Sequence, residues 1–253
     1  MIPLEELSLN AWPALQTLVY DGWIIRLSGG YGNRANSINP LYPSALPLEE
    51  KFAKCKELFS SQGLLTTYKL TGHGKDSPPE HGCLDQALAE MNYRVINETS
   101  MQVCAITADN TAPGAKAQGK ILLSDSFSEG WIQSVIAYNT IEEAHRPILR
   151  GILGNIKIEK IIARIEREGE IIACGYGAIE NGYVGLYDIV VKKEERGKGH
   201  GEAVVRALLA EAHKRGIQKS YLQVMLNNPV ALSLYKKLGY TEQYRYWYRK
   251  EAP

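Results

Sequence analysis

The sequence has little that would tie it to a membrane, to a nucleic acid or to an oxidising compartment. Its 29 basic and 28 acidic residues leave a net charge of +1, so no charge excess attracts nucleic acid or an anionic membrane surface. No apolar run is long enough to span a bilayer. The four cysteines lie far apart and form no CxxC pair, which argues against a disulfide framework or a zinc site.

The amino terminus also lacks the basic residues that begin a signal peptide, because MIPLEELSLNAW carries acidic residues there. With 45% hydrophobic residues the chain can bury a core, which excludes the disordered and fibrous classes. We therefore expect a soluble, cytoplasmic protein without a membrane or nucleic-acid partner. Whether it forms a homo-oligomer is left open.

A change in composition divides the 253 residues into two units. Residues 107–119, TADNTAPGAKAQG, contain no large apolar residue. We predict a linker there, between an N-terminal domain over 1–106 and a C-terminal domain over 120–253. Both domains end in a strand, a helix, an apolar residue, a small one, a tyrosine and a last strand. The triplets that match are MNY at 91–93 and LGY at 238–240, which indicates an internal repeat.

Hydrophobic periodicity and turn residues predict alternating strands and helices in both domains. In the N-terminal domain we expect strands at 22–28, 64–70 and 93–106, and helices at 48–63 and 84–91. In the C-terminal domain we expect two helices in 129–155, strands at 160–166, 171–179 and 183–191, a helix at 201–215, a strand at 220–226, a helix at 229–238 and a strand at 244–250. Asn181-Gly182 predicts a hairpin, and Gly216 predicts a left-handed helix stop.

Three glycines, Gly197, Gly199 and Gly201, lie within five positions at the start of the helix expected at 201–215, although glycine is a poor helix former. Backbone N–H groups at such a strand–loop–helix junction can bind a phosphate. A dinucleotide GxGxxG motif would need glycine in place of Glu202 or Val204, so it is excluded. A P-loop is excluded too, because no Gly-Lys pair is followed by Ser or Thr.

The pattern that fits is R-x-x-G-x-G, at Arg196, Gly199 and Gly201. Downstream, Asn-x-x-Ala-x-x-x-Tyr-x-x-x-Gly-Tyr begins at Asn228 and leads into an aromatic strand. With the hairpin into YDIVV, these features make residues 120–250 resemble the GNAT superfamily of acyl-CoA-dependent N-acetyltransferases. The resemblance implies an α/β (α+β) fold with a mixed, mostly antiparallel central sheet flanked by helices. It also implies two related units in tandem, with a degenerate GNAT-like unit at the N-terminus.

The same resemblance implies a transferase that moves an acetyl group from acetyl-CoA to an amine. The loop would hold the pyrophosphate, and strand main chain would bind the pantetheine arm and polarise the thioester carbonyl. The implied acetyl-CoA-binding residues are Ile189, Val190, Val191, Arg196, Gly197, Lys198, Gly199, His200, Gly201 and Asn228. Tyr235 matches the family's general acid toward the departing thiolate. The acceptor would be an amine-bearing small molecule or a peptide.

The general base is less defined by the sequence. An amine near its ordinary pKa of about 10 must lose a proton before or during attack. Asp188 precedes the pantetheine-binding residues and either takes that proton, directly or through water, or is a structural residue. Strand alternation puts Asp188 and Val190 on one face and Tyr187, Ile189 and Val191 on the other.

Other polar residues form no convincing constellation. We expect His200 to fill a solvent-facing position, and we expect no metal at His73 and His81, which flank a loop-like segment. The N-terminal domain lacks an R-x-x-G-x-G loop followed by an amphipathic helix, so it would shape the acceptor site rather than bind its own cofactor. Arg34, with Asn36 and Ser37, is either a site residue or part of a well-bonded turn; the turn is favoured. A non-catalytic acyl-CoA-binding regulatory module is the alternative function.

Overall fold

The computed structural model describes residues 4–72, 80–114 and 118–252. The first half contains α1 (Leu4–Ala11), β1 (Gln16–Tyr20), β2 (Trp23–Leu27), β3 (Ser37–Pro40), α2 (Leu48–Ser60), β4 (Thr67–Gly72), α3 (Glu80–Glu90) and β5 (Arg94–Ala105). After α4 (Ala108–Thr111), the second half contains β6 (Lys120–Ser124), α5 (Glu129–Tyr138), α6 (Arg146–Gly154), β7 (Glu159–Arg167), β8 (Glu170–Glu180), β9 (Tyr183–Val191), α7 (His200–Lys214), β10 (Lys219–Met225), α8 (Pro229–Lys237) and β11 (Thr241–Lys250).

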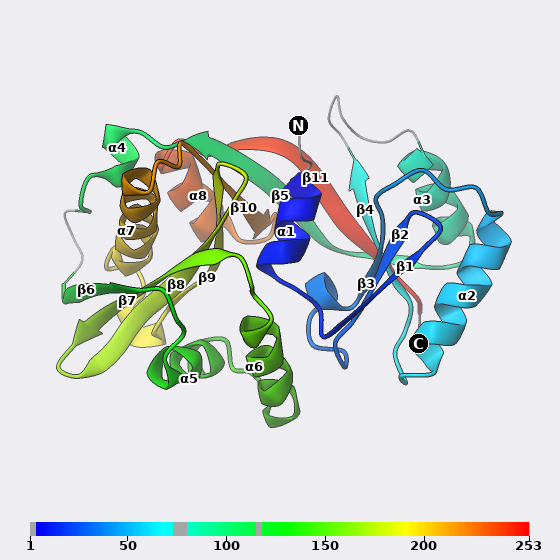
Figure 1. The fold of residues 1–253 in the computed structure, drawn as a ribbon, viewed down its shortest axis with the longest axis horizontal. Helices are drawn as coiled ribbons and strands as arrows, with labels where there is room; N and C mark the ends of the chain where they lie inside the picture. Colours follow the sequence, from blue (N-terminus) through cyan, green and yellow to red (C-terminus); the bar gives the residue numbers. More distant parts are fainter. Residues whose placement is uncertain (1–3, 73–79, 115–117, 253) are drawn as a thin grey trace.

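Within these ranges, eleven strands form one continuous sheet with helices on both faces (Figure 1). The strand order is β1-β2-β3-β4-β11-β5-β10-β9-β8-β7-β6. Neighbours pair antiparallel, except that β3 runs parallel to β4 and β9 runs parallel to β10. The predicted mixed, mostly antiparallel sheet flanked by helices is thereby confirmed.

Read outward from the middle of the sheet, the two halves have matching strand orders. Outward from β11 lie β4, β3 and β2, and outward from β5 lie β10, β9 and β8. The turns before the last strands match as well, since Asn92 and Gly239 have φ of 63° and 87°. The N–H groups of Tyr93 and Tyr240 both donate to the carbonyl five residues earlier. The internal repeat predicted from the sequence is confirmed.

The last strand of each half lies against the other half. β5 pairs with β10, and β11 pairs with β4, so the halves share one sheet. The borders of the domains at 1–106 and 120–253 therefore stay predictions. The predicted linker at 107–119 contains α4, where Thr107 and Asn110 form a capping box.

Separate apolar cores lie on the faces of the sheet. α7 packs on β7, β8 and β9 through Val204 and Leu208, whereas α1, α5 and α6 cover the opposite face around Trp131. A third core lies around Phe59, between α2, α3 and the strands of the first half. Among the described residues, no helix has the length and apolar character to cross a bilayer.

Local turn signals are confirmed in the second half. Asn181 and Gly182 have φ of 49° and 78°, as a type I′ turn requires at its two central positions, and they join β8 to β9. Gly216, with φ of 84°, follows the end of α7. These two turns fix where β9 begins and where α7 ends, and both elements border the site described next.

Candidate functional site

The parallel strands β9 and β10 part midway along their length. Pairing joins Tyr183–Leu186 to Lys219–Leu222 and goes no further among the described residues. β9 nevertheless continues to Val191 beside β8, and β10 continues to Met225 beside β5. Beyond Leu186, the main-chain edge of β9 that faces β10 therefore has no strand partner there.

A β-bulge turns β9 where the two strands part. The register of β9 against β8 shifts between residues 187 and 190, so that Asp188 and Ile189 both lie opposite Gly175. Asp188 has φ of 48°, which is uncommon for a residue with a side chain. A Cβ on Gly175 would lie 3.3 Å from the Cα of Ile189, so this close approach favours glycine.

The bulge changes which side chains share a face. Ile189 and Val191 pack against the core beneath α7, whereas Tyr187 and Val190 pack in the core on the opposite face. The prediction that Tyr187 shares a face with Ile189 and Val191 is wrong, because simple alternation does not allow for an inserted residue. Asp188 acts electrostatically on Cys174 and Tyr176, which belong to the core of Val190.

Asp188 is a buried carboxyl group whose hydrogen-bonding capacity is incompletely used. Its side chain is 10% exposed, and its Oδ2 has no hydrogen-bond partner among the described residues. Burial raises the pKa of Asp188, and Arg34, with Nη2 3.9 Å from Oδ1, partly opposes this. A carboxyl group with a raised pKa and an unused oxygen is suited to accept a proton.

Arg34 reaches Asp188 from the loop between β2 and β3, in the other half of the chain. Its guanidinium carbon lies 4.6 Å from the ring centre of Trp12 and 5.8 Å from that of Tyr187. In the described part of the chain the guanidinium makes no hydrogen bond, and 36% of the side chain is exposed. Burial acts to lower the pKa of Arg34, but Asp188 and nearby tyrosines raise it overall.

The loop that carries Arg34 is held from inside by Asn36. The Asn36 side chain accepts the N–H groups of Ser28 and Gly30 and donates to two further loop carbonyls. Ser37 accepts a bond from a neighbour in β3. The favoured interpretation as a well-bonded turn is confirmed for Asn36 and Ser37, whereas the Arg34 side chain extends to Asp188.

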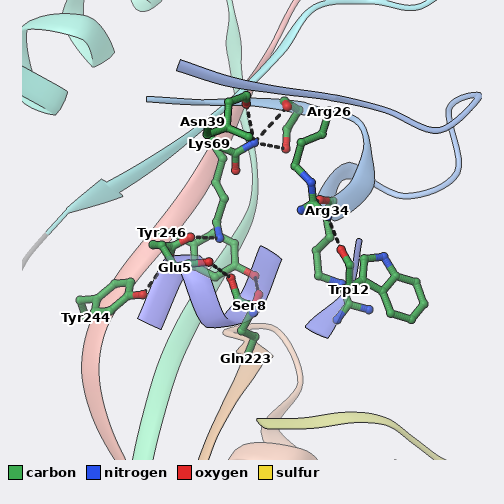
Figure 2. A network of polar contacts seen from close by, with 12 residues as sticks. Glu5, Ser8, Trp12, Arg26, Arg34, Asn39, Lys69, Gln223, Tyr244 and Tyr246 are labelled. Carbon is green, nitrogen blue, oxygen red and sulfur yellow. Dashed lines mark hydrogen bonds and ion pairs between the residues drawn. The ribbon is translucent and has the colours of Figure 1, made fainter. Parts of the chain in front are cut away.

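Figure 2 shows the polar network that holds this loop against the end of α1. The Arg26 side chain donates to the carbonyl oxygens of Trp12 and Arg34. Burial lowers the pKa of Arg26 to about 10. Arg26 thus fixes the backbone of the two residues whose side chains stack on each other beside Asp188.

The same network ties α1 to three strands of the sheet (Figure 2). Glu5 accepts bonds from Lys69 in β4 and from the Tyr244 hydroxyl in β11, the latter at 2.8 Å. The Lys69 ammonium lies 4.0 Å from the ring centre of Tyr246, whose hydroxyl donates to Gln223 in β10. Burial lowers the pKa of Lys69, although Glu5 opposes this. Both halves of the chain therefore contribute to this polar network.

The glycine-rich loop connects β9 to α7 at the open end of the parted strands. Gly197 and Gly199 have φ of 78° and 84°, a backbone that favours glycine. In the described structure the N–H groups of Gly197, Lys198 and Gly199 donate to no acceptor. The first N–H groups of α7 have no partner within the helix either. Together they form an edge of N–H donors at the positive end of a helix, which is suited to an anion.

Side chains of the loop point in different directions. Arg196 Nε donates to the Val191 carbonyl at 3.3 Å, and the Lys198 ammonium lies 3.2 Å from Glu195. His200 is buried, with Nε2 3.3 Å from the Glu195 carboxylate. The expectation that His200 faces solvent is wrong, because the carboxylate inside the loop holds the imidazole inward. Gly201 packs beside Val191, where a Cβ would have ordinary contacts.

The predicted general acid lies on α8. Asn228 caps this helix, because its Oδ1 accepts the N–H of Ala231 at 3.1 Å. The Tyr235 ring is buried edge-on against Tyr240, with 5.7 Å between ring centres, in the core that Ile189 packs against. Burial raises the pKa of Tyr235 to about 12, so its hydroxyl keeps its proton at neutral pH.

Two aromatic residues near Asp188 were not predicted as site residues. Trp12 covers Arg34, and Tyr31 has a pKa raised to about 12 by burial and by Asp188. The Tyr31 ring lies 5.5 Å from that of His145, centre to centre. No local signal marks these residues, because Tyr31 and Trp12 are brought to Asp188 and Arg34 by packing between distant parts of the chain.

No group of three or more His, Cys, Asp or Glu suited to a metal ion occurs within residues 4–72, 80–114 and 118–252. His73 and the side chain of His81 lie outside the described residues.

Sequence comparison finds relatives along the whole chain. The model of the family "Probable histone acetyltransferase Rv0428c C-terminal" matches residues 2–249. The uncharacterized N-acetyltransferase YobR of Bacillus subtilis (strain 168) is 28% identical over 247 residues, which cover 97% of this chain and 96% of YobR. The ribosomal protein bS18-alanine N-acetyltransferase of Escherichia coli (strain K12) is 35% identical over 57 residues, which cover 22% of this chain and 38% of that protein.

Solved structures share the fold at low sequence identity. A GCN5-related N-acetyltransferase from Kribbella flavida superposes with a TM-score of 0.66 at 11% identity, covering 99% of this chain and 95% of its own. A tandem GNAT protein from the clavulanic acid biosynthesis pathway superposes with a TM-score of 0.61 at 15% identity, covering 81% of this chain and 70% of its own.

Proposed function

The chain belongs to the family of the probable histone acetyltransferase Rv0428c C-terminal domain, within the GNAT N-acetyltransferases, and we propose that it transfers an acetyl group from acetyl-CoA to a primary amine. One observation carries this proposal: the open edge of β9 leads directly to unpaired N–H groups at the start of α7. An open strand edge suits an extended amide-containing arm, and the helix end suits a phosphate. Coenzyme A has both parts.

The residues of the second half fit this cosubstrate. The N–H groups of Gly197, Lys198 and Gly199 would hold the pyrophosphate, with Arg196 adding positive charge. Main chain of residues 189–191 would pair with the pantetheine amides. Asn228 uses its oxygen to cap α8, which leaves its amide N–H groups for the cosubstrate.

The equivalent helix start in the first half is already filled. The N–H groups of Ala45 and Leu46, just before α2, donate to the Asp21 carboxylate at distances from 2.9 to 3.1 Å. An internal anion thus uses donors that a phosphate would need. This supports the proposal that only the second half binds acetyl-CoA.

Bound acetyl-CoA supplies the acetyl thioester, and this chain moves the protons. Asp188 would take a proton from the attacking amine at Oδ2, directly or through one water. Its buried surroundings favour the neutral form that results. Main-chain N–H groups in residues 189–191 would polarise the thioester carbonyl, and Tyr235 would donate its hydroxyl proton to the departing thiolate.

Calorimetry and product analysis test the proposal on the full chain. We expect acetyl-CoA to bind, and we expect thiol release together with an acetylated product from an amine panel of small amines, amino acids, peptide N-termini and lysine side chains. Absence of acetyl-CoA binding would overturn the proposal. Binding without acetylation of any amine would support the non-catalytic acyl-CoA-binding module instead.

A further inference from the structure

Resting on this proposed function, we infer that the acceptor is a free α-amino acid, whose carboxylate is bound by Arg34 while its amine faces Asp188. The two side chains belong to different halves of the chain and meet at 3.9 Å on the face of β9 opposite α7. Neither is saturated by the protein, and each has the chemistry to bind one end of an amino acid.

Arg34 has the features of a carboxylate-binding arginine. The Trp12 ring lies over its guanidinium, so the N–H groups at the edge are the donors left for a ligand. Within the described residues these donors have no hydrogen-bonded acceptor, and a third of the side chain is exposed. A planar guanidinium with a free edge matches the two oxygens of a carboxylate.

Asp188 supplies the complementary group. Its Oδ2 is buried and unpartnered among the described residues, so an ammonium or amine N–H that reaches it would satisfy a polar atom which otherwise has no partner. An acceptor with an amine alone would bring a second positive charge beside Arg34. An amino acid avoids this repulsion, because its carboxylate neutralises the guanidinium.

The distance between Arg34 and Asp188 restricts the acceptor further. With only 3.9 Å between the two charged groups, a ligand that contacts both needs its amine and carboxylate close together. An α-amino acid carries both groups on one carbon. The side chain of a lysine within a peptide has no neighbouring carboxylate, and the amino terminus of a peptide has an amide in its place.

Arg26 supports this role by positioning Arg34. It binds the carbonyls of Trp12 and Arg34, so the stacked pair is held before a ligand arrives. The Asn36 bonds fix the rest of the loop. The first half of the chain, which has no R-x-x-G-x-G loop of its own, would thus contribute the specificity of the second half's site.

Matched acceptor pairs test the inference on the full chain. Phenylalanine is compared with phenethylamine and phenylalaninamide, leucine with isopentylamine, and lysine with a peptide whose only amine is a lysine side chain. Two quantities are measured for each: kcat/KM by thiol release, and affinity for the complex with coenzyme A by calorimetry. We expect the amino acids to exceed their carboxylate-free partners by about 10- to 100-fold, the range for a hydrogen-bonded charge pair.

At a pH well above the acid limb of the kcat/KM profile, Arg34→Gln is expected to remove this preference, mainly by raising KM for amino acids, with a much smaller change for the carboxylate-free amines. Arg215→Gln is the control, because it removes a guanidinium at the far end of α7 that pairs with Asp125, Glu159 and Glu211, and it should keep the preference. Melting temperatures of both variants show whether they fold.

If the wild type used carboxylate-free amines as well as the matching amino acids, the inference would be overturned and the proposed function would stand. An equal loss for both substrate classes in Arg34→Gln would also overturn it, since Arg34 would then only hold Asp188. If acetyl-CoA binds but no acceptor is acetylated, the proposed function fails. Calorimetry then decides the inference: if amino acids bind no more tightly to the wild type than to Arg34→Gln, the inference is overturned.

Discussion

The Lys51 ammonium lies 3.1 Å from the Asp21 carboxylate at the N-terminus of α2. The same carboxylate accepts the N–H groups of Ala45 and Leu46. By the internal repeat, α2 corresponds to α7, whose preceding loop leaves its N–H groups unpaired in the described structure. In the first half the N–H donors before this helix are therefore occupied by a side chain of the protein, whereas in the second half they have no acceptor among the described residues.

Asp21→Asn should destabilise the fold in a pH-dependent manner. Bonds from the N–H groups of Ala45 and Leu46 lower the pKa of Asp21 to about 2, below its ordinary value of 3.8. The ionised carboxylate therefore stabilises the folded state above about pH 4, and this contribution is lost as pH falls from about 4 to about 2. The melting temperature of wild type should exceed that of the variant near pH 6, and the gap should narrow toward pH 3. A gap that stays constant would contradict this.

Gly199→Ala should weaken acetyl-CoA binding, whereas Gly216→Ala should not. Both glycines have φ of 84°, one at the start of α7 and one after its end. Each substitution should therefore cost a similar free energy of unfolding, about 1–2 kcal/mol. Alanine keeps the backbone N–H, but the strain at Gly199 would shift the N–H groups of the proposed phosphate loop, whereas Gly216 lies outside that loop. Calorimetry should therefore show a loss of affinity for the Gly199 variant alone. Equal affinities in both variants would remove the loop from the binding site.

The features that could be predicted from the sequence are those set by neighbouring residues. Asn181-Gly182 forms its hairpin and Gly216 ends α7 because each turn depends on the backbone freedom of its own residues. The match of residues 91–93 to 238–240 was visible for the same reason. The turns also reveal the internal repeat, because the strands of the two halves share little sequence identity.

Features that depend on pairing partners were missed. The bulge at Asp188 arises from the register against β8, so alternation along β9 alone assigned Tyr187 to the wrong face. α1 was not predicted, since only eight residues form it and its position depends on Glu5 meeting Lys69. Arg34 reaches Asp188 only because β5 and β11, each paired with a strand of the other half, join the two halves into one sheet. Long-range packing, and not propensity, brings together the residues of the proposed acceptor site.

Tyr235→Phe should lower kcat while leaving acetyl-CoA affinity unchanged. The Tyr235 hydroxyl has no hydrogen-bond partner within the described residues, and its pKa of about 12 keeps it protonated. Loss of a general acid typically costs about 10²-fold or more in rate. The matched control is Tyr240→Phe. The Tyr240 hydroxyl lies 2.6 Å from Ser220 Oγ, so its removal should lower the free energy of unfolding by about 1 kcal/mol and leave kcat nearly unchanged. Similar kcat values for wild type and Tyr235→Phe would exclude the acid role.

Asp188→Asn should lower kcat/KM by about 10²- to 10⁴-fold, the range for loss of a general base, with acetyl-CoA affinity retained. Burial raises the pKa of Asp188, so the acid limb of the wild-type kcat/KM profile should lie above the ordinary carboxyl value. The base works only when ionised, and activity should therefore fall as pH drops through this raised pKa.

Arg34 provides a second test of that assignment, because its positive charge lowers the pKa of Asp188 against the effect of burial. Arg34→Gln should consequently move the acid limb to still higher pH, whichever amine is used. Profiles of wild type and variant, measured with a carboxylate-free amine, separate this electrostatic effect from loss of acceptor binding. An acid limb that does not move would mean that the group titrating in the profile is not Asp188.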